Sequence, residues 1–251
     1  MNPVPKRVLI TGSSGSFGTF MASRLLEEGY EVVGLDLVIP SAPPFADDAT
    51  NVSTRWHFKQ CDLSDPLAVE QILGDGKMDP FDVVVNNLGF IYSSPLLSFN
   101  AGRLMIHDFD AWNKVLSSTL SSTFYITAFC ARQSLSASKR SLIVNISSVC
   151  AAGNPGQAAY SAAKAGVNGL TSALAKELGP LGIRVAAIAP GFFDTASTRQ
   201  AVAEEALTRV CRNIPLRKLG SPEQLYHALR FIMDNDYFHG KVLELDGGLT
   251  L

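Results

Sequence analysis

The sequence predicts a doubly wound α/β fold, in which helices cover both faces of a parallel sheet. Apolar runs of strand length alternate with amphipathic segments of helix length along the chain. Several of these runs are apolar nearly throughout, as strands buried on both faces must be. No internal repeat and no linker interrupts the alternation, so we expect a single domain over residues 1–251.

The first half of the chain opens the pattern. The run RVLI (7–10) is the first predicted strand, and FGTFMASRLLEEG (17–29) follows with apolar residues at helical spacing. Gly29 stands where a helix C-cap is expected. We expect further strands at 31–36, 57–62 and 82–87, a helix at 65–73, and surface loops at 40–48 and around 93–102.

The second half continues in the same way. Ser221 and Pro222 are typical of an N-cap followed by proline at the first helical position. Apolar residues at helical spacing predict the helices, and continuous apolar runs predict the strands. The expected elements are a long helix at 109–135, a strand at 141–147, a helix at 158–179, a strand at 184–190, a helix at 221–235 and a strand at 241–246.

Composition excludes several function classes. The formal net charge is −2, with no long run of one sign, which is not the electrostatic pattern of a nucleic-acid binder. No apolar run is long enough to cross a bilayer, and the first residues lead into a strand, so we expect no signal peptide and a cytoplasmic location. The four cysteines form no CxxC pair and the four histidines show no metal-ligand spacing, so we expect neither disulfide nor metal.

A glycine-rich loop, TGSSGSFG (11–18), follows the first predicted strand and precedes the first predicted helix. A doubly wound fold binds phosphate there, and glycine permits positive φ and close approach of the backbone to a pyrophosphate. Asp36 ends the second strand, where a carboxylate accepts hydrogen bonds from ribose hydroxyls and repels a 2′-phosphate. The competing interpretations are a tight turn and a residue that merely ends a strand.

A second constellation is YSAAK (160–164). Positions i and i+4 share one face of a helix, so Tyr160 and Lys164 point into the same space. A nearby ammonium lowers the pKa of a phenol, which would make Tyr160 a general acid/base. Ser147 and Ser148 end a strand shortly before it, where a hydroxyl can polarise a substrate carbonyl. A chance YxxxK and a turn-forming serine pair are the alternatives.

Together these residues resemble the short-chain dehydrogenase/reductase family, in its short single-domain branch with a Rossmann-like fold. The resemblance runs from Arg7 to Leu251. It rests on TGSSGSFG, CDL (61–63), NNLG (86–89), NISS (145–148), YSAAK, PGFFDT (190–195) and HGKVLELDGG (239–248). The resemblance implies hydride transfer between a nicotinamide dinucleotide and an alcohol or carbonyl.

The resemblance also implies the site. The catalytic set is Ser148, Tyr160 and Lys164, with Thr119 where the family has an asparagine that helps to hold a water in a proton relay. Leu37 follows Asp36 and no cation is near, so NAD is expected and NADP less so. The implied cofactor-binding residues are Gly12, Ser14, Ser16, Phe17, Gly18, Asp36, Leu37, Asp62, Leu63, Asn87, Leu88, Gly89, Tyr160, Lys164, Pro190, Gly191, Phe193 and Thr195.

Three departures from the family pattern matter. Ser16 stands at the second loop glycine and Gly15 precedes it, a spelling typical of the nucleotide-sugar branch. Thr119 replaces the asparagine, although much of the contact there uses the main chain. The distance from Ser148 to Tyr160 is one residue shorter than usual, whereas Ser147 has the usual count; we favour Ser148 because it is the last serine of NISS.

The sequence therefore predicts an NAD-dependent oxidoreductase that interconverts a secondary alcohol and a ketone, with a small-molecule substrate. Alternatives are a nucleotide-sugar epimerase or dehydratase and a catalytically degenerate NAD-binding regulator. We expect no nucleic-acid or membrane partner, and a homotetramer or homodimer packed through helices around 110–135 and 158–178. Residues expected to line an apolar substrate pocket, or else the core, are Phe90, Ile91, Phe192, Phe193 and about 196–215.

Overall fold

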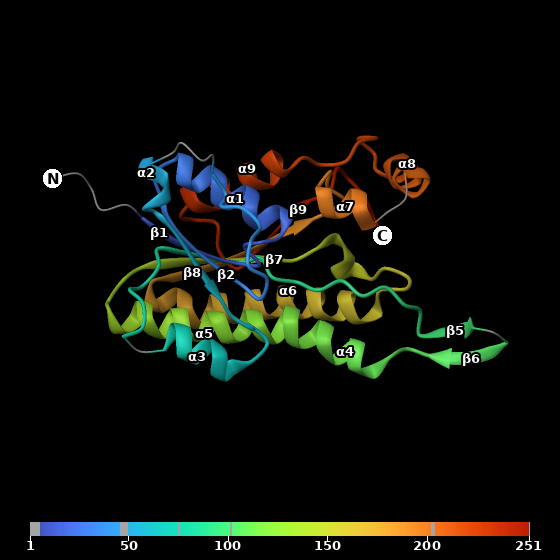
Figure 1. The fold of residues 1–251 in the computed structure, drawn as a ribbon, viewed down its shortest axis with the longest axis horizontal. Coiled ribbons are helices and arrows are strands. Elements are labelled where there is room, and N and C mark those ends of the chain that lie inside the picture. Colours follow the sequence, from blue (N-terminus) through green and yellow to red (C-terminus); the bar gives the residue numbers. More distant parts are fainter. Residues whose placement is uncertain (1–5, 46–49, 75, 101, 202–203, 251) are drawn as a thin grey trace.

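A computed structural model describes residues 6–45, 50–74, 76–100, 102–201 and 204–250. The first five residues and part of the predicted 40–48 loop lie outside them. A seven-stranded sheet forms the middle layer, in the order β3-β2-β1-β4-β7-β8-β9 (Figure 1). Every neighbouring pair in this sheet is parallel, which confirms the predicted α/β fold.

The predicted strands all form, with ends shifted by one or two residues. Continuous valine, isoleucine and leucine runs favour strands covered on both faces. The strands of the large sheet are β1 Arg7–Thr11, β2 Glu31–Asp36, β3 Trp56–Gln60, β4 Val83–Asn86, β7 Ser141–Ile146, β8 Ile183–Pro190 and β9 Val242–Leu245.

The helices cover the two faces. They are α1 Ser16–Glu27, α2 Thr50–Ser53, α3 Pro66–Leu73, α4 Phe109–Leu116, α5 Ser122–Ser136, α6 Ala158–Leu178, α7 Ala196–Ala201, α8 Glu204–Asn213 and α9 Pro222–Asp234. The predicted N-cap of α9 at Ser221 is confirmed, and α3 also has a side-chain cap, which was not predicted. Asp65 accepts a hydrogen bond from the backbone of α3, and Ser221 with Gln224 forms a capping box on α9.

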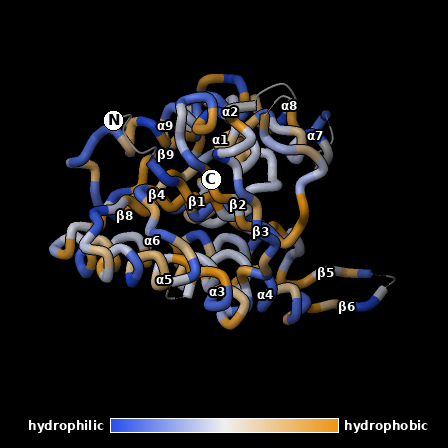
Figure 2. The backbone as a smooth tube through the Cα atoms, turned by 60° about the vertical axis from the view of Figure 1, so that its left-hand side comes forward, coloured by the Kyte–Doolittle hydropathy of each residue, from blue (hydrophilic) through white to orange (hydrophobic). Residues whose placement is uncertain are grey.

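Two hydrophobic cores lie on opposite faces of the sheet. Alternate residues of one strand face different cores, because side chains alternate along a strand. Val8 and Ile10 pack with α1 and α9, whereas Leu9 packs with α3, α5 and α6. Figure 2 shows the hydrophobic strands enclosed between the two helical layers. The helices on both faces leave the carboxyl ends of the strands as the natural edge for a site.

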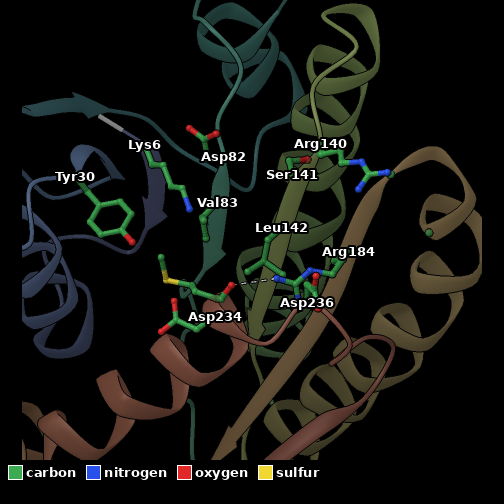
Figure 3. Close-up of a pocket in the computed structure, with 13 residues that line it drawn as sticks. Lys6, Tyr30, Asp82, Val83, Arg140, Ser141, Leu142, Arg184, Asp234 and Asp236 are labelled. Carbon is green, nitrogen blue, oxygen red and sulfur yellow. Dashed lines mark hydrogen bonds between the residues drawn. The ribbon is translucent and has the colours of Figure 1, made fainter. Parts of the chain in front are cut away.

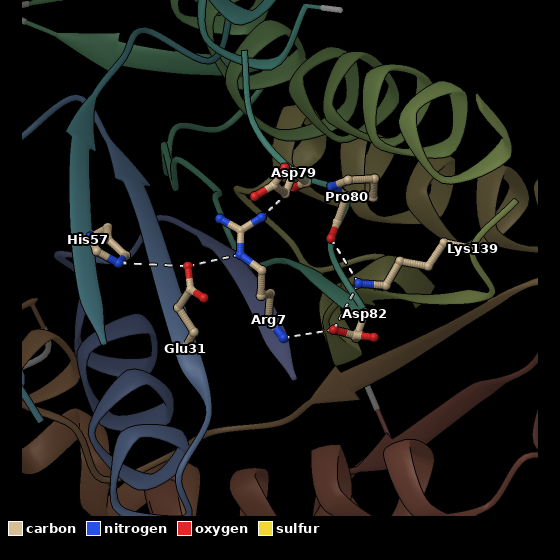
Figure 4. Close-up of polar contacts among 7 residues, drawn as sticks. All are labelled: Arg7, Glu31, His57, Asp79, Pro80, Asp82 and Lys139. Carbon is tan, nitrogen blue, oxygen red and sulfur yellow. Dashed lines mark hydrogen bonds and ion pairs between the residues drawn. The ribbon is translucent and has the colours of Figure 1, made fainter. Parts of the chain in front are cut away.

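An ion-pair cluster joins the amino ends of the strands, at the opposite edge (Figure 4). The guanidinium of Arg7 donates to Glu31 at 2.9 Å, and the Nε2 atom of His57 lies 3.7 Å from the same carboxylate. The backbone N–H of Arg7 donates to Asp82, which also pairs with Lys139 at 3.1 Å. Because these contacts are partly exposed, they add little to stability.

Two segments differ from the sequence prediction. The expected long helix at 109–135 is divided by a π-helical turn, Ser117–Ser121, between α4 and α5. The expected loop around 93–102 is instead part of a hairpin of β5, Leu97–Asn100, and β6, Arg103–Ile106. This hairpin projects from the body beside α4 (Figure 1). The two strands are short and form because they pair with each other. A local sequence pattern does not reveal that pairing.

Candidate active site

The site is built at the carboxyl ends of β1, β4, β7 and β8. The chain runs outward from β1 to β3 and then returns to β4 on the other side of β1. The loops after β1 and β4 therefore diverge from each other and leave a crevice between them. Doubly wound sheets bind ligands at such a switch point. The predicted glycine loop and the NNLG segment are the two sides of this crevice.

The glycine loop leaves the first turn of α1 open. Gly12 has φ +64°, and its N–H donates to the carbonyl of Leu35. A Cβ at position 18 would collide with the carbonyl of Gly12 and lie 2.7 Å from Cα of Ser13. Only glycine therefore lets α1 pack against this loop. No side chain caps the N-terminus of α1, so its free N–H groups suit a pyrophosphate.

The serine at the variant loop position makes its own contact. The hydroxyl of Ser16 lies 2.6 Å from that of Ser197, which ties the loop to α7. A Cβ at Gly15 would come no closer than 3.4 Å to the carbonyl of Gly12, so this position does not require glycine for space. An open hollow of about 730 Å³ lies beside the loop, between Ser14 and Ser16 on one side and Pro43 and Thr195 on the other.

Asp36 is fixed at the end of β2. Its carboxylate accepts hydrogen bonds from the backbone N–H groups of Ser14, at 2.9 Å, and Val38, at 3.0 Å. The side chain is buried, and Leu37 behind it is exposed. A carboxylate with two backbone donors retains free lone pairs for ribose hydroxyls. Asp36 therefore both orders the glycine loop and presents negative charge beside it.

The turn after β4 holds the other side of the crevice. The side-chain amide of Asn87 donates to the carbonyls of Thr11 and Gly12, both at 3.1 Å. The hydroxyl of Thr11 in turn accepts from the backbone N–H groups of Asn87 and Leu88. A Cβ at Gly89 would lie 3.2 Å from the ammonium nitrogen of Lys164. The glycine leaves room for that lysine, which links this turn to α6.

Tyr160 and Lys164 lie one turn apart on α6, as predicted from their spacing. The ammonium of Lys164 is 5.7 Å from the centre of the Tyr160 ring and donates a 2.6 Å hydrogen bond to the carbonyl of Ile146. Both side chains are buried. Burial lowers the pKa of Lys164 to about 8, because desolvation disfavours its charged form.

The pKa of Tyr160 shifts in the opposite direction from the sequence-based expectation. Burial raises it above its ordinary value, the nearby Cys150 raises it further, and a hydrogen bond with Ser148 lowers it. The expectation that Lys164 makes the pKa fall is therefore wrong for the protein alone. The physical reason is that desolvation of the buried phenol raises the pKa by more than the hydrogen bond with Ser148 lowers it.

The two candidate serines have different partners. The hydroxyl of Ser147 is buried and donates to the backbone carbonyl of Lys164 at 3.3 Å. The hydroxyl of Ser148 accepts from the backbone N–H of Cys150 and contacts the phenol of Tyr160. Ser148 is thus the serine that faces the candidate acid/base, whereas Ser147 braces α6 against β7.

Thr119 lies inside the π-helical turn and is fully buried. Its hydroxyl accepts a 3.3 Å hydrogen bond from the backbone N–H of Phe90, and its carbonyl accepts one from the hydroxyl of Thr123 at 2.8 Å. Its hydroxyl oxygen lies 3.8 Å from where a Cβ of Gly89 would be, next to the Lys164 ammonium. The turn therefore brings Thr119 to the lysine side of the site, where π-helical turns often mark function.

Some of the other predicted cofactor residues pack in the cores, and the rest lie in turns or at the ends of elements. Leu63 and Phe193 are buried in the cores, and Phe193 meets Phe17 edge to face at 5.4 Å. Their side chains pack the walls behind the crevice. Asp62 instead closes a turn by accepting from Ser64, and Thr195 bonds Thr198 in the first turn of α7. Pro190 ends β8, and a Cβ at Gly191 would lie 2.8 Å from Cα of Asp246.

Only part of the predicted apolar lining lies beside Tyr160. Phe90 packs beside Tyr160 in a small cluster with Val115 and Cys150. Ile91 is exposed, and Phe193 belongs to the main core rather than to a pocket. Positions 202–203 of the expected 196–215 lining lie outside the described residues. The apolar wall nearest to Tyr160 is therefore the segment that carries Phe90.

Sequence reasoning missed Cys150. It considered the four cysteines only as partners in a disulfide or metal site, and all four thiols are free. Cys150 lies close enough to affect the pKa of Tyr160, and its thiol donates to the side chain of Gln157 at 3.4 Å. No spacing signal marks it, because its place follows from the short turn after Ser148.

A second hollow, of about 420 Å³, lies at the other edge of the sheet (Figure 3). It opens at the amino ends of β4, β7 and β8, where doubly wound sheets do not bind ligands. Arg184 at its wall already donates to the carbonyls of Ile232, Asn235 and Phe238, which close α9. The hollow also contains none of the predicted site residues, so it is not the candidate active site.

Comparison with known proteins agrees with this geometry. A family model described as short chain dehydrogenase matches residues 6–206. Human 3-hydroxyacyl-CoA dehydrogenase type-2 is 31% identical over 97% of this chain and 94% of its own length. The 3-oxoacyl-(acyl-carrier-protein) reductase FabG of Chlamydia muridarum is 31% identical over 98% of both chains.

A solved structure matches as well. The short chain dehydrogenase from Leptospira borgpetersenii, crystallised with bound NAD⁺, superposes with a TM-score of 0.84 at 25% identity, over 98% of this chain and 93% of that one. No helix among the described residues has the length and apolar character needed to span a membrane. With the fold, the glycine loop and the Tyr160–Lys164 pair in place, the chain belongs to the short-chain dehydrogenase/reductase family and is an oxidoreductase that acts on CH–OH groups.

Proposed function

We propose that this protein oxidises a secondary alcohol to a ketone, or reduces the ketone, with NAD as the preferred cofactor. The observation that carries the proposal is the convergence of Ser148, Tyr160 and Lys164 at the end of β7 and the start of α6. A phenol that contacts a hydroxyl, with an ammonium one turn away, suits proton exchange with an alcohol oxygen.

Tyr160 is the proposed general acid/base. In the reductive direction its phenol, the form that the raised pKa favours, gives its proton to the ketone oxygen, and in the oxidative direction the deprotonated Tyr160 takes that proton from the substrate hydroxyl. Ser148 donates a hydrogen bond to the same oxygen and so holds it beside the phenol. The lowered pKa of Lys164, about 8, allows this residue to exchange protons near neutral pH.

The crevice suits a nicotinamide dinucleotide. Gly12, Gly18 and the uncapped start of α1 would hold the pyrophosphate, Asp36 the adenosine ribose, and Lys164 the nicotinamide ribose. When bound, the cofactor supplies the redox chemistry by accepting or returning a hydride. Asp36 favours NAD over NADP because its buried carboxylate would repel a 2′-phosphate.

The first substrate class to test is the 3-hydroxyacyl thioester with its 3-oxo partner. Two relatives carry names that denote dehydrogenation or reduction at this position of an acyl thioester. The apolar wall at Phe90 suits the acyl portion of such a molecule. Simple secondary alcohols without a thioester are the second class.

The test is a turnover screen. Both substrate classes are offered with NAD or NADP, and with the reduced cofactors and matching ketones, while absorbance of the reduced nicotinamide is followed. Net formation of NADH with a hydroxyacyl thioester supports the proposal. A redox-neutral product would instead indicate an epimerase. Cofactor binding without turnover on any substrate would overturn the enzymatic proposal in favour of a regulator.

A further inference from the structure

The side chain of Ser16, at the variant position of the glycine loop, contacts α7. Its hydroxyl lies 2.6 Å from the hydroxyl of Ser197 and accepts from the backbone N–H of the same residue at 3.4 Å. Ser16 is the first residue of α1, and Ser197 is the second residue of α7. A glycine at position 16 would keep the backbone N–H that a phosphate can use, but would make neither contact. The variant serine therefore joins the starts of two helices.

This contact crosses the carboxyl edge of the sheet. Helix α1 follows β1 and helix α7 follows β8, and β4 and β7 lie between these two strands. Three strand spacings of about 4.8 Å separate the strand ends by about 14 Å. Both helices lie on the same side of the sheet as α9 (Figure 1), and Phe17 meets Phe193 on that side. The contact therefore bridges one side of the crevice proposed for the dinucleotide.

Helix α7 needs attachment because it is short. It has six residues, well below the length at which an isolated helix is stable in water. The hydroxyl of Thr195 caps it by accepting from the backbone N–H of Thr198 at 3.1 Å. The N–H of Ser197 lies in the first turn, where no acceptor exists within the helix, and Ser16 supplies one. Ser16 therefore helps to fix where α7 begins.

Packing does not replace this contact. The open hollow of about 730 Å³ is lined by Ser14 and Ser16 from the glycine loop side and by Asp194 and Thr195 from the base of α7. Ser197 itself is exposed. Within the described parts of the chain, no other hydrogen bond joins α1 to α7. Loss of the Ser16 hydroxyl should therefore free the start of α7 from α1.

We infer that Ser16 is a positioning residue that acts through Ser197 and holds α7 across the crevice as a gate for the dinucleotide. This inference rests on the proposed function, because it needs the dinucleotide between the glycine loop and the NNLG turn. A bridge that forms equally with and without the dinucleotide must open for entry and for release. Its loss therefore raises both rates and leaves the affinity nearly unchanged, since the gate favours neither state.

Stopped-flow fluorescence of NADH measures both rates. Ser16→Ala removes both contacts and should make entry and release about three- to tenfold faster, which is the range that an exposed hydrogen bond supplies. Ser197→Ala removes only the hydroxyl contact and should have a smaller effect in the same direction. Ser16→Thr keeps a hydroxyl and should retain slow exchange. Ser23→Ala, on the same helix and at the same hollow, is the matched control and should exchange NADH like the unmodified protein.

A second measurement needs no cofactor. Arg199 lies in α7, and trypsin cleaves after it only when the helix opens locally. Mass spectrometry of the fragments therefore reports how firmly α7 is attached. Cleavage after Arg199 should be faster in Ser16→Ala than in the Ser23→Ala control.

Three results would overturn the gate. Weaker NADH binding in Ser16→Ala, with an unchanged entry rate and no effect in Ser197→Ala, would assign the hydroxyl of Ser16 directly to the phosphates. Unchanged exchange and unchanged cleavage in both variants would show that the bridge holds nothing. If NADH does not bind the unmodified protein, the proposed function fails and the gate with it, whereas faster cleavage after Arg199 in Ser16→Ala would still support the attachment of α7 by Ser16.

Discussion

The ammonium of Lys164 donates a 2.6 Å hydrogen bond to the carbonyl of Ile146, the last residue of β7. This contact connects the helix that carries the proposed acid/base to the strand that leads to Ser148. The lysine is buried, and no carboxylate among the described residues forms an ion pair with it. Its position therefore costs stability, and that cost has a pH dependence that can be measured.

Replacing Lys164 with methionine should stabilise the protein at pH 7. The unfolded chain keeps the lysine proton up to about pH 10.5, whereas the folded chain loses it near pH 8. The unfolded state thus binds more protons between these values, and stability of the unmodified protein rises with pH there. Burial of the charge costs about 3 kcal/mol at pH 7, so the advantage of Lys164→Met should shrink as pH rises above 8.

Urea unfolding at several pH values measures this difference. Lys176→Met, at an exposed position of the same helix, is the control and should show no such pH dependence. A constant difference between Lys164→Met and the unmodified protein from pH 7 to pH 10 would contradict the lowered pKa.

Tyr160→Phe should reduce turnover by about 10²–10⁴-fold, because in the proposed mechanism the phenol transfers the proton in the transition state. Affinity for NAD should stay within a few-fold, since the ring remains in place. Tyr237→Phe, at a highly exposed position, controls for the loss of a phenol elsewhere. Steady-state kinetics and equilibrium binding separate the two effects, and near-normal turnover in Tyr160→Phe would refute the proposed mechanism.

The two serines can be distinguished in the same assay. Ser148→Ala removes the hydroxyl that faces Tyr160 and should lower kcat strongly with little change in melting temperature. Ser147→Ala removes a buried hydrogen bond to the backbone of Lys164 and should mainly lower stability, by about 1 kcal/mol. The reverse pattern would assign the substrate contact to Ser147.

Asp36→Asn should narrow the preference for NAD over NADP, since it removes the negative charge but keeps much of the shape. Asp36→Ala should narrow it too, and should also weaken both cofactors because the N–H groups of Ser14 and Val38 lose their acceptor. Asp236→Ala, at the opposite edge of the sheet, is the control. Equal affinity of the unmodified protein for both cofactors, by titration calorimetry, would disprove this role of Asp36.

The fold followed from local patterns because parallel strands covered on both faces carry continuous apolar runs, as 83–85 and 142–144 do. The pairing of Tyr160 with Lys164 followed from helical spacing alone. The hairpin of β5 and β6 could not be predicted in this way, because its apolar residues face solvent and do not follow the periodicity of a buried face. The π-helical turn was also missed, since an inserted residue changes hydrogen bonding without changing the apolar pattern. The direction in which the pKa of Tyr160 shifts depends on burial of the side chain, which sequence spacing does not reveal.

The substitution Thr119→Asn tests whether the departure from the family pattern weakens the enzyme. The hydroxyl of Thr119 accepts from the backbone of Phe90, and its carbonyl already accepts from the hydroxyl of Thr123. A carbonyl has two lone pairs, so this one can still hold a relay water. If that carbonyl is what the relay uses, the side chain matters little.

The expected result is then a change in turnover of less than about tenfold, or roughly 1.4 kcal/mol of barrier. Ser117→Asn, in the same π-helical turn, controls for a longer side chain there. Thr119 is fully buried, so an asparagine that does not fit would lower the melting temperature together with activity. A large gain in turnover with unchanged melting would instead mean that the side-chain amide is needed and that Thr119 cripples the natural catalyst. We expect the small change in turnover. Hydrogen bonds and packing hold Ser148, Tyr160 and Lys164 in place. An inactive relay would give no reason to maintain that arrangement.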